Sequence, residues 1–379
     1  MVAPAKFRPT CAVLLAAALG ASPALALVSL NDGKDHLYVT GSASVAYDSN
    51  LFAHAGGGGD FIYSAGLVFD YVRRAGWIGV NGNVALNASR FGSNTTEDFN
   101  NPRFGLEFVK ISGRTTGALS LSATRESEAD AAVNQRVQSW NYNAATNFKY
   151  PVIERYSFAG SLAFGDRIYD NPTGLTDLRT YTAGMDLFYL LSTNRDLLAG
   201  YQFRRSETSA NSTFNDHSFT FGLTGRILPK LNGSVRAGYQ VRTPMGATTD
   251  GSFKGLTASG AVTWTTTRKL SLTGHLTRDV SVTSSNESVD TTAAGLEANY
   301  AMTGRFALSA STGTGVNRFL SVAGAGRRDV YFDSGVGVSY KMNDHLKAAL
   351  GYAYMENWST FSYSDFTRHT VTFTLSSRW

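Results

Sequence analysis

Cysteine, proline and long apolar stretches are scarce in this sequence of 379 residues. Its single cysteine, Cys11, leaves no partner for a disulfide and no thiol cluster for a metal ion. Only 8 prolines interrupt the chain, so long strands meet few breaks. Beyond residue 26, no stretch approaches the roughly 18 consecutive apolar residues of a transmembrane helix. These absences exclude a disulfide-linked scaffold and a helical membrane protein.

The first 26 residues have the pattern of a secretory signal peptide. Lys6 and Arg8 precede an apolar run from 11 to 21, and Ala24-Leu25-Ala26 offers a small-x-small cleavage site. The run is too short for a membrane anchor. A lipid-attachment role for Cys11 lacks the small apolar residues that such a site needs before it. We therefore expect export and cleavage after Ala26.

The remainder is expected to form a short lead-in at 27–36 and one domain at 37–379. Loss of the signal peptide lowers the formal net charge from +5 to about +3, and the charges are spread along the chain. This distribution indicates no nucleic-acid partner. The 38 glycines, 18 tyrosines and 23 phenylalanines favour many strands, tight turns and aromatic belts.

Polar and apolar residues alternate strictly at the C-terminus. One face of the last segment carries His369 and the four residues Val371, Phe373, Leu375 and Trp379, while arginine, threonine and serine fill the gaps. Alternation over about ten residues is typical of a transmembrane β-strand with one face toward lipid and one toward water. A closing strand with a terminal aromatic resembles the signal by which outer-membrane barrels are recognised for assembly, so these four residues are the predicted assembly signal.

The same alternation recurs along the chain in about eighteen segments, beginning at 37–47 and 61–71. The connections alternate between short turns and longer loops, as they do in outer-membrane barrels. The longer ones are expected near 48–60, 92–102, 127–138, 169–177, 207–216, 244–253, 283–290, 318–328 and 357–366. The predicted fold is an all-β, transmembrane, antiparallel up-and-down β-barrel of about eighteen strands, with sixteen as the alternative count. An extracellular β-sandwich or solenoid fits less well, because an apolar face appears on every strand.

The inward face is expected to be small and polar, so it cannot fill a barrel about 35 Å across. None of the external loops looks long enough to fold inside as a substantial constriction. We therefore expect a wide, weakly selective pore, or one closed by something that the chain does not encode. Four arginines on neighbouring strands form a candidate basic patch in the lumen; the alternative is a charge ladder paired with acidic neighbours. These arginines are Arg204, Arg226, Arg236 and Arg242.

Catalysis is not expected, although His275 and Asp279 both point inward in this register. They stand four residues apart on one strand, about 13 Å by strand rise, which is too far for direct contact. We expect no cofactor and no metal ion. An outer-membrane hydrolase remains only a distant alternative.

The segment from Val45 to Phe52 contains Tyr47, Asp48 and Asn50 at the end of the first strand. It resembles the Tyr-Asp-x-Asn-hydrophobic motif of the putative β-barrel porin 2 family, whose strand pattern the chain matches along nearly its whole mature length. The resemblance implies an outer-membrane channel or accessory barrel linked to exopolysaccharide synthesis and export. For the three motif residues a turn-forming role is favoured over ligand binding, because Asp and Asn side chains cap backbone groups where a strand gives way to a loop.

These observations predict an integral outer-membrane channel of a Gram-negative cell for passive or partner-gated passage of hydrophilic solutes, with saccharides or exopolysaccharide as candidate cargo. The alternative is a non-conducting structural or accessory barrel in an envelope polysaccharide system. Expected partners are outer-membrane lipids, the barrel assembly machinery and the transported solutes. A porin-like trimer is an analogy with the architecture.

Overall fold

The computed structural model describes residues 27–110, 112–170, 174–245, 252–320 and 326–379, so the expected signal peptide lies outside the described residues. In these ranges no helix has the length and apolar character needed to cross a membrane. The regular structure consists of two 3₁₀ segments, η1 (Thr95–Glu97) and η2 (Ser362–Ser364), and nineteen strands. The strands are β1 (Val28–Leu30), β2 (Asp35–Asp48), β3 (Asp60–Arg73), β4 (Ile78–Phe91), β5 (Phe99–Lys110), β6 (Thr116–Asp130), β7 (Gln135–Ile153), β8 (Tyr156–Tyr169), β9 (Leu178–Ser192), β10 (Arg195–Thr208), β11 (Thr213–Leu228), β12 (Leu231–Met245), β13 (Phe253–Thr265), β14 (Leu270–Val282), β15 (Ser288–Ala301), β16 (Phe306–Phe319), β17 (Arg328–Lys341), β18 (Leu346–Ser359) and β19 (Phe366–Arg378).

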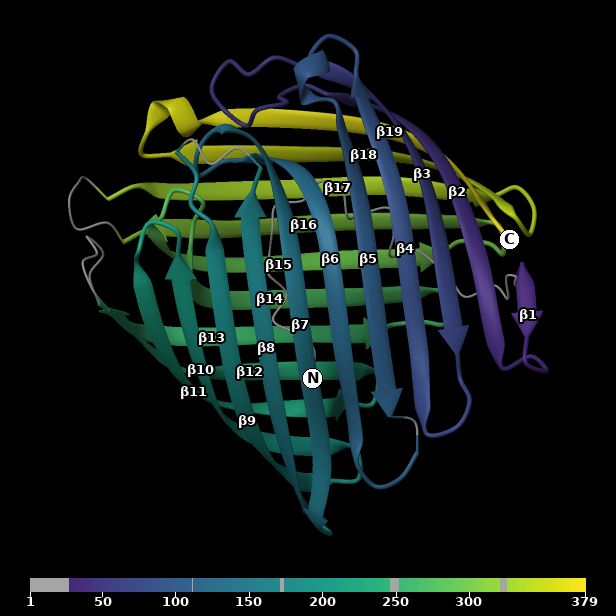
Figure 1. The fold of residues 1–379 in the computed structure, drawn as a ribbon, viewed down its shortest axis with the longest axis vertical. Coiled ribbons are helices and arrows are strands. Elements are labelled where there is room, and N and C mark those ends of the chain that lie inside the picture. Colours follow the sequence, from purple (N-terminus) through teal and green to yellow (C-terminus); the bar gives the residue numbers. More distant parts are fainter. Residues whose placement is uncertain (1–26, 111, 171–173, 246–251, 321–325) are drawn as a thin grey trace.

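Strands β2 to β19 form one closed antiparallel barrel (Figure 1). Each pairs with the next along the chain, and β19 closes the ring on β2 from Thr370↔Asp48 to Arg378↔Thr40. Closure removes the open edge, whose unpaired N–H and C=O groups would each cost several kcal/mol in lipid. The predicted antiparallel barrel of about eighteen strands is confirmed.

The closing seam continues beyond the end of β19. The backbone N–H and C=O of Trp379 each bond to Val39 at 2.8 Å, and β1 then pairs with β2 from Asp35 to Leu37. Since β3 occupies the other edge of β2 over the same residues, β1 and β19 share one edge. This edge of β2 is therefore covered nearly end to end.

The two faces of each strand differ as the alternation predicts. Outward positions carry large apolar side chains that are exposed on the isolated barrel, among them Phe221 (70%), Leu256 (64%) and Phe373 (50%). An apolar outer band suits contact with lipid. Inward positions are mostly small and polar, as in Ser42, Ser44, Ser64, Asn141, Asn143, Ser161, Thr257, Ser259 and Thr374.

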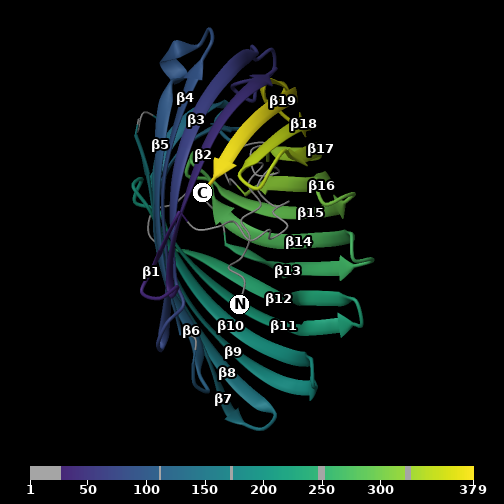
Figure 2. The ribbon, with the colours of Figure 1, turned by 90° about the vertical axis from the view of Figure 1, so that its right-hand side faces the viewer.

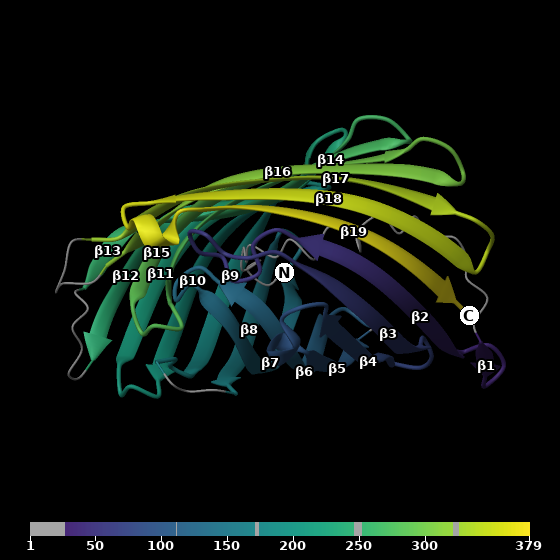
Figure 3. The ribbon, with the colours of Figure 1, turned by 90° about the horizontal axis from the view of Figure 1, so that it is seen from above.

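The barrel is flattened rather than round (Figures 2 and 3). Seen from above, one broad wall contains β2 to β8 and the opposite wall contains β14 to β19, while β10 to β13 lie at the bend between them. Flattening brings side chains of opposite walls within reach of one another. It also narrows the lumen that a round barrel of the same strand number would enclose.

Two predicted long loops are wrong, and one of them, near 207–216, is only a turn of residues 209–212 between β10 and β11. The sequence predicts a long connection near 127–138, but β6 and β7 stay paired out to Asp130↔Gln135, so that only residues 131–134 form the turn. Asn134 adopts a positive φ of 54° there, a conformation that Asn tolerates better than most residues. The outer ends of both strands are mostly polar, as the residues Glu126, Glu128 and Asp130 of β6 show. The result is a long hairpin, which we call the β6–β7 hairpin (residues 126–139).

Candidate channel lumen

The β6–β7 hairpin crosses the barrel at the end that carries the longer loops. Ala129 and Ala131 pack against a cluster that contains Ala293 of β15, Tyr331 of β17 and Met355 of β18. In a ring of eighteen strands, β6 and β15 are nine strands apart in either direction, which is the greatest separation that the ring allows. The hairpin therefore touches the opposite wall, and the expectation that no external segment constricts the lumen is wrong.

Arg327 anchors the tip of this hairpin. Its guanidinium donates to the backbone oxygens of Ala132 at 2.9 Å and Ala131 at 2.6 Å. The same guanidinium forms an ion pair with the Asp329 carboxylate at 2.7 Å. The side chain is buried and lies over the ring of Phe319, 4.6 Å from its centroid. Charge-assisted hydrogen bonds are stronger than neutral ones. Arg327 thus joins the hairpin turn to the segment that leads into β17 on the far wall.

Further polar contacts fix the hairpin at both sides of its turn. The Asn134 amide donates to the Ala53 carbonyl at 2.8 Å and accepts from the Ser364 hydroxyl at 2.8 Å. On the preceding strand, Asp130 accepts a hydrogen bond of 2.6 Å from Ser284 in the β14–β15 loop. Loops that are far apart in sequence therefore close over this end of the barrel together.

Three of the four arginines in the predicted lumen patch lie at the bend and face carboxylates. Arg204 of β10 contacts Asp216 at 2.8 Å and reaches Asp279 of β14 at 2.7 Å. Arg242 is fully buried and contacts the same Asp216 at 2.6 Å. Arg236 pairs with Asp186 of β9 at 3.0 Å. These three cations form the paired arrangement of a charge ladder, so little of their charge is left to attract a solute.

Arg226 is placed elsewhere. It lies at the opposite end of β11 from Asp216, near the short turns, with an exposed side chain. Its backbone carbonyl accepts from the Arg195 side chain at 2.9 Å. In the described residues no carboxylate lies within salt-bridge distance of Arg226. The structure therefore separates it from the other three arginines.

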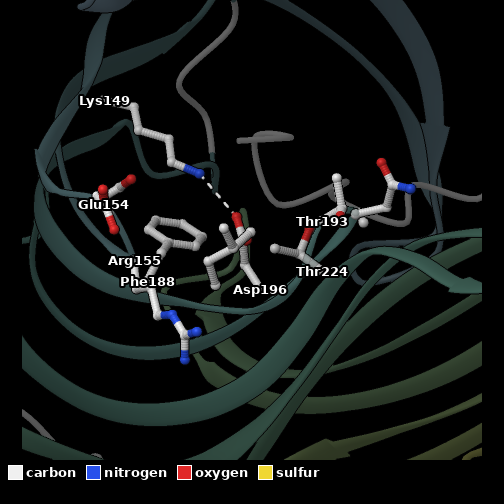
Figure 4. Close-up of a pocket in the computed structure, with 11 residues that line it drawn as sticks. Lys149, Glu154, Arg155, Phe188, Thr193, Asp196 and Thr224 are labelled. Carbon is white, nitrogen blue, oxygen red and sulfur yellow. Dashed lines mark hydrogen bonds and ion pairs between the residues drawn. The ribbon is translucent and has the colours of Figure 1, made fainter.

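Two cavities lie side by side at this end of the barrel, which we call the short-turn end. The first, of about 360 Å³, is lined by Lys149, whose ammonium lies 3.0 Å from Asp196 and 4.1 Å from the ring centroid of Phe188 (Figure 4). The second, of about 750 Å³, shares Asn194 and Gly225 with the first. The strand turns that shape them connect β7–β8, β9–β10, β11–β12 and β13–β14.

A single carboxylate in a short turn illustrates the basic surroundings at this end. Asp344, fully exposed in the β17–β18 turn, accepts a hydrogen bond from Lys341 at 3.0 Å. This bond and the charge of Lys341 hold the pKa of the Asp344 carboxyl below its usual value. The aspartate therefore stays ionised at any ordinary pH.

The motif residues Tyr47, Asp48 and Asn50 sit beside the closing seam. Asp48 is buried and paired with Arg368 of β19, and its carboxylate also accepts from the Asn50 backbone at 3.1 Å. The Asn50 amide donates to the carbonyl of His54 at 2.9 Å. Tyr47 faces outward. These contacts organise a turn and join the first strand to the last.

The predicted assembly residues Val371, Phe373 and Leu375 face outward on β19. Trp379 stacks on His345 with ring centroids 4.0 Å apart and planes 10° apart. The tryptophan is thereby fixed at the rim of the short-turn end. Recognition by assembly machinery stays a prediction.

The two inward residues considered for catalysis are not brought together. Asp279 is held by Arg204, while His275 Nε2 lies 3.7 Å from Glu297 Oε1 on the neighbouring strand. No group of three or more His, Cys, Asp or Glu side chains in the described ranges could hold a metal ion. Nothing in this arrangement orients a base toward a nucleophile.

Residues 218–378 match the model of the family described as putative beta-barrel porin 2. The resemblance that the sequence suggests is therefore confirmed over this part of the chain. The Tyr-Asp-x-Asn motif lies outside the matched residues. The curated proteins contain no match to the chain.

Solved structures show the same fold at low sequence identity. The outer membrane protein OpdK of Pseudomonas aeruginosa, solved with vanillate, is 12% identical over 90% of this chain and 99% of its own, with a TM-score of 0.51. OccK2 (OpdF) of the same organism, solved with glucuronate, is 11% identical over 91% of this chain and 98% of its own, with a TM-score of 0.52. The chain spans only 62% of the FrpB iron transporter from Neisseria meningitidis, and 85% of this chain aligns at 12% identity with a TM-score of 0.46, so that likeness carries no argument. At these identities the comparisons establish the barrel fold alone.

Proposed function

We propose that the chain forms an outer-membrane channel for hydrophilic solutes. The observation that carries the proposal is a closed eighteen-strand ring whose outer face is apolar and whose inner face is small and polar. Such a ring is stable in lipid and encloses water. The family match over residues 218–378 and the fold of the outer membrane protein OpdK support this location.

The channel is gated rather than permanently open. The β6–β7 hairpin crosses to the opposite wall and is held there by Arg327 and Asn134. Passage through this end therefore requires displacement of the hairpin, either by spontaneous undocking or by a partner that competes for its contacts. In this topology the hairpin end faces outward from the cell and the short-turn end faces the periplasm.

Saccharides are the proposed cargo. Hydroxyl and amide side chains dominate the inward face and match the hydrogen-bonding groups of sugars. In the same fold, OccK2 was solved with the sugar acid glucuronate. The family resemblance adds exopolysaccharide as a candidate. Cleavage of residues 1–26 and insertion by the barrel assembly machinery complete the proposed route to the outer membrane.

A non-conducting accessory barrel is the second candidate, and the bridging hairpin is the observation that favours it. Such a barrel would serve an envelope polysaccharide system without passing solute itself. A hydrolase is not favoured, because Asp279 is held by Arg204 and is unavailable to His275.

Single-channel recording on the chain from Leu27 to Trp379, refolded in detergent and inserted into a planar bilayer, tests the proposal. We expect discrete current steps with closures, since the hairpin docks and undocks. A detergent blank and heat-unfolded protein are the controls. A folded barrel that gives no current, even under voltage that detaches loops, would favour the accessory barrel.

A further inference from the structure

Basic side chains gather at the short-turn end of the barrel. Nearly every turn there carries lysine or arginine, whereas carboxylates are few and include Glu154, Asp196 and Asp344. Cations clustered at the mouth of a low-dielectric cleft focus a positive potential and raise the local concentration of anions. The basic residues are Arg73, Arg74, Lys110, Arg114, Arg155, Arg195, Arg226, Lys230, Arg268, Lys269 and Arg305.

On one side of this end the charges line a cavity. The larger of the two cavities, about 750 Å³, is lined by Arg226, Lys230 and Arg268 and by no carboxylate, and we call it the basic cavity. Its volume lies within the range of about 300–1,000 Å³ that is common for ligand sites. The cavity lies between the β9–β10, β11–β12 and β13–β14 turns.

The cations of the basic cavity have unused hydrogen-bonding capacity. Among the described residues, neither Arg226 nor Arg268 has a carboxylate within 4 Å. Lys230 donates to the carbonyl of Thr266 at 3.0 Å, which leaves two of its three N–H donors. This contrasts with Arg204 and Arg242 at the bend, whose donors are taken by aspartates. An anionic ligand would supply the counter-charge that these three neighbouring cations lack.

The other lining residues of the basic cavity indicate the chemical class of the molecule that carries the anionic groups. The basic cavity adds hydroxyl and amide groups from Thr265, Thr267, Asn194 and Asn232, beside apolar surface that includes Pro229 and Leu231. Protein interfaces rely on aromatic anchors in desolvated pockets, and no aromatic side chain among the described residues lines this cavity. Asn232 and Thr265 occupy lumen-facing strand positions, so this part of the cavity faces the barrel interior. The chemistry therefore fits a carboxylated oligosaccharide.

The adjoining cavity continues the site into the barrel. Its lining holds two cations, Lys149 and Arg155, and two carboxylates, Asp196 and Glu154, so its charges balance (Figure 4). Ser157, Thr193 and Thr224 supply hydroxyls. A ligand that enters with its carboxylates on Arg226 and Arg268 would place its neutral hydroxyls here. The two cavities together accept a chain of several sugar units rather than a single ion.

We propose that the basic cavity is a docking site for acidic oligosaccharides at the periplasmic mouth of the barrel. The site rests on the proposed channel function for its place in the molecule, because it would select cargo as it enters from the periplasm. It names sugar acids as the substrate class. Neutral saccharides of the same length dock weakly there.

Calorimetric titration of the refolded barrel in detergent with trigalacturonate tests this site, with neutral maltotriose as the matched ligand. We expect binding of trigalacturonate that weakens as sodium chloride is raised, and at least tenfold weaker binding of maltotriose. The double variant R226Q/R268Q should lose about tenfold or more in affinity. The control variant R74Q/R114Q removes two exposed arginines from the same end outside the cavity and should change affinity less than twofold. Heat-modifiable migration in electrophoresis verifies that each variant is folded.

Four outcomes would overturn the proposal: no binding of trigalacturonate, equal binding of maltotriose, equal losses in the two double variants, or tighter binding of hexaglutamate than of trigalacturonate. Displacement of trigalacturonate by phosphatidylglycerol added to the micelles would identify a lipid site instead. Binding is measured without a bilayer, so it is independent of conductance. Binding without current would refute the channel and leave the site standing, whereas current without binding would refute the site alone.

Discussion

Releasing the β6–β7 hairpin should open the barrel. The double substitution R327K/N134G addresses its two main attachments without leaving a buried charge unpaired. Lysine keeps a cation beside Asp329 but lacks the planar fork that bonds the carbonyls of Ala131 and Ala132 together. Glycine accepts the positive φ of residue 134 and removes its bonds to Ala53 and Ser364.

The size of the effect follows from the bonds removed. Hydrogen bonds to a charged group contribute about 1.5–3 kcal/mol each, and neutral ones about 0.5–1.5 kcal/mol. Lysine retains part of the first set, so docking of the hairpin should weaken by about 3 kcal/mol. This corresponds to a change of roughly 100-fold in the docking equilibrium. The apolar packing of Ala129 and Ala131 on the far wall remains.

Single-channel recording measures the change directly. The variant should spend a larger fraction of time in its highest conductance state than the native chain does. The matched control R328K/N211G alters the exposed arginine next to Arg327 and an asparagine with φ of 62° in another external turn, and it should leave the current unchanged. If a folded R327K/N134G barrel shows the same conductance and open lifetimes as the control, the hairpin does not gate the channel.

Three further predictions concern the barrel wall and its ends. Phe221→Arg places a charge on the lipid face near the middle of β11 and should destabilise the barrel by about 2–4 kcal/mol. The control Thr220→Arg, on the lumen face, should destabilise it much less. Urea unfolding in vesicles compares the two variants, and equal losses of stability would contradict the assigned faces. Asp48→Asn removes the carboxylate that pairs with Arg368 across the closing seam and should lower stability by about 1.5–3 kcal/mol, measured as the temperature at which the folded electrophoretic band is lost. Because the pKa of Asp344 is depressed in the folded state, its small contribution to stability is present above its unfolded pKa and is lost as pH falls through the lower folded pKa. Carboxyl titration by NMR should therefore show the Asp344 pKa rising toward its ordinary value in Lys341→Ala, and an unchanged pKa would refute the contact.

Much of the fold is readable from local pattern. Segments such as 61–71 and 367–379 alternate apolar and polar residues, and this period of two dictates which side chain meets lipid and which meets water. The same pattern specifies register strongly, because a slip of one residue would turn an apolar face inward. The prediction of about eighteen strands was confirmed for this reason.

The β6–β7 hairpin could not be predicted from the local alternation of apolar and polar residues. Residues 127–138 contain no aromatic residue, leucine or isoleucine and only two valines, so the sequence predicts a loop. The alternation of Glu126, Glu128 and Asp130, followed by a turn-forming Asn134, is the signal from which a longer hairpin could have been predicted. Its docking partner on β15 and β17 has no signature near these residues.

For the lumen arginines, the sequence predicts the inward placement but not the ion pairs. The sequence placed Arg204, Arg226, Arg236 and Arg242 on inward faces of neighbouring strands, but pairing with Asp186, Asp216 and Asp279 depends on carboxylates up to four strands away. The curvature of the bend brings those strands close enough for contact. Only Arg226 is left near the short turns, where the basic cavity lies.

The sequence by itself determined the barrel, its two faces and its closure, because backbone pairing and side-chain alternation act between neighbouring residues and neighbouring strands. Tertiary structure alone decided the shape of the lumen. The hairpin that crosses the ring is held by contacts between segments more than a hundred residues apart, and the basic cavity is built from three separate turns between Asn194 and Arg268. Such contacts depend on where the closed wall bends, and no local periodicity encodes that.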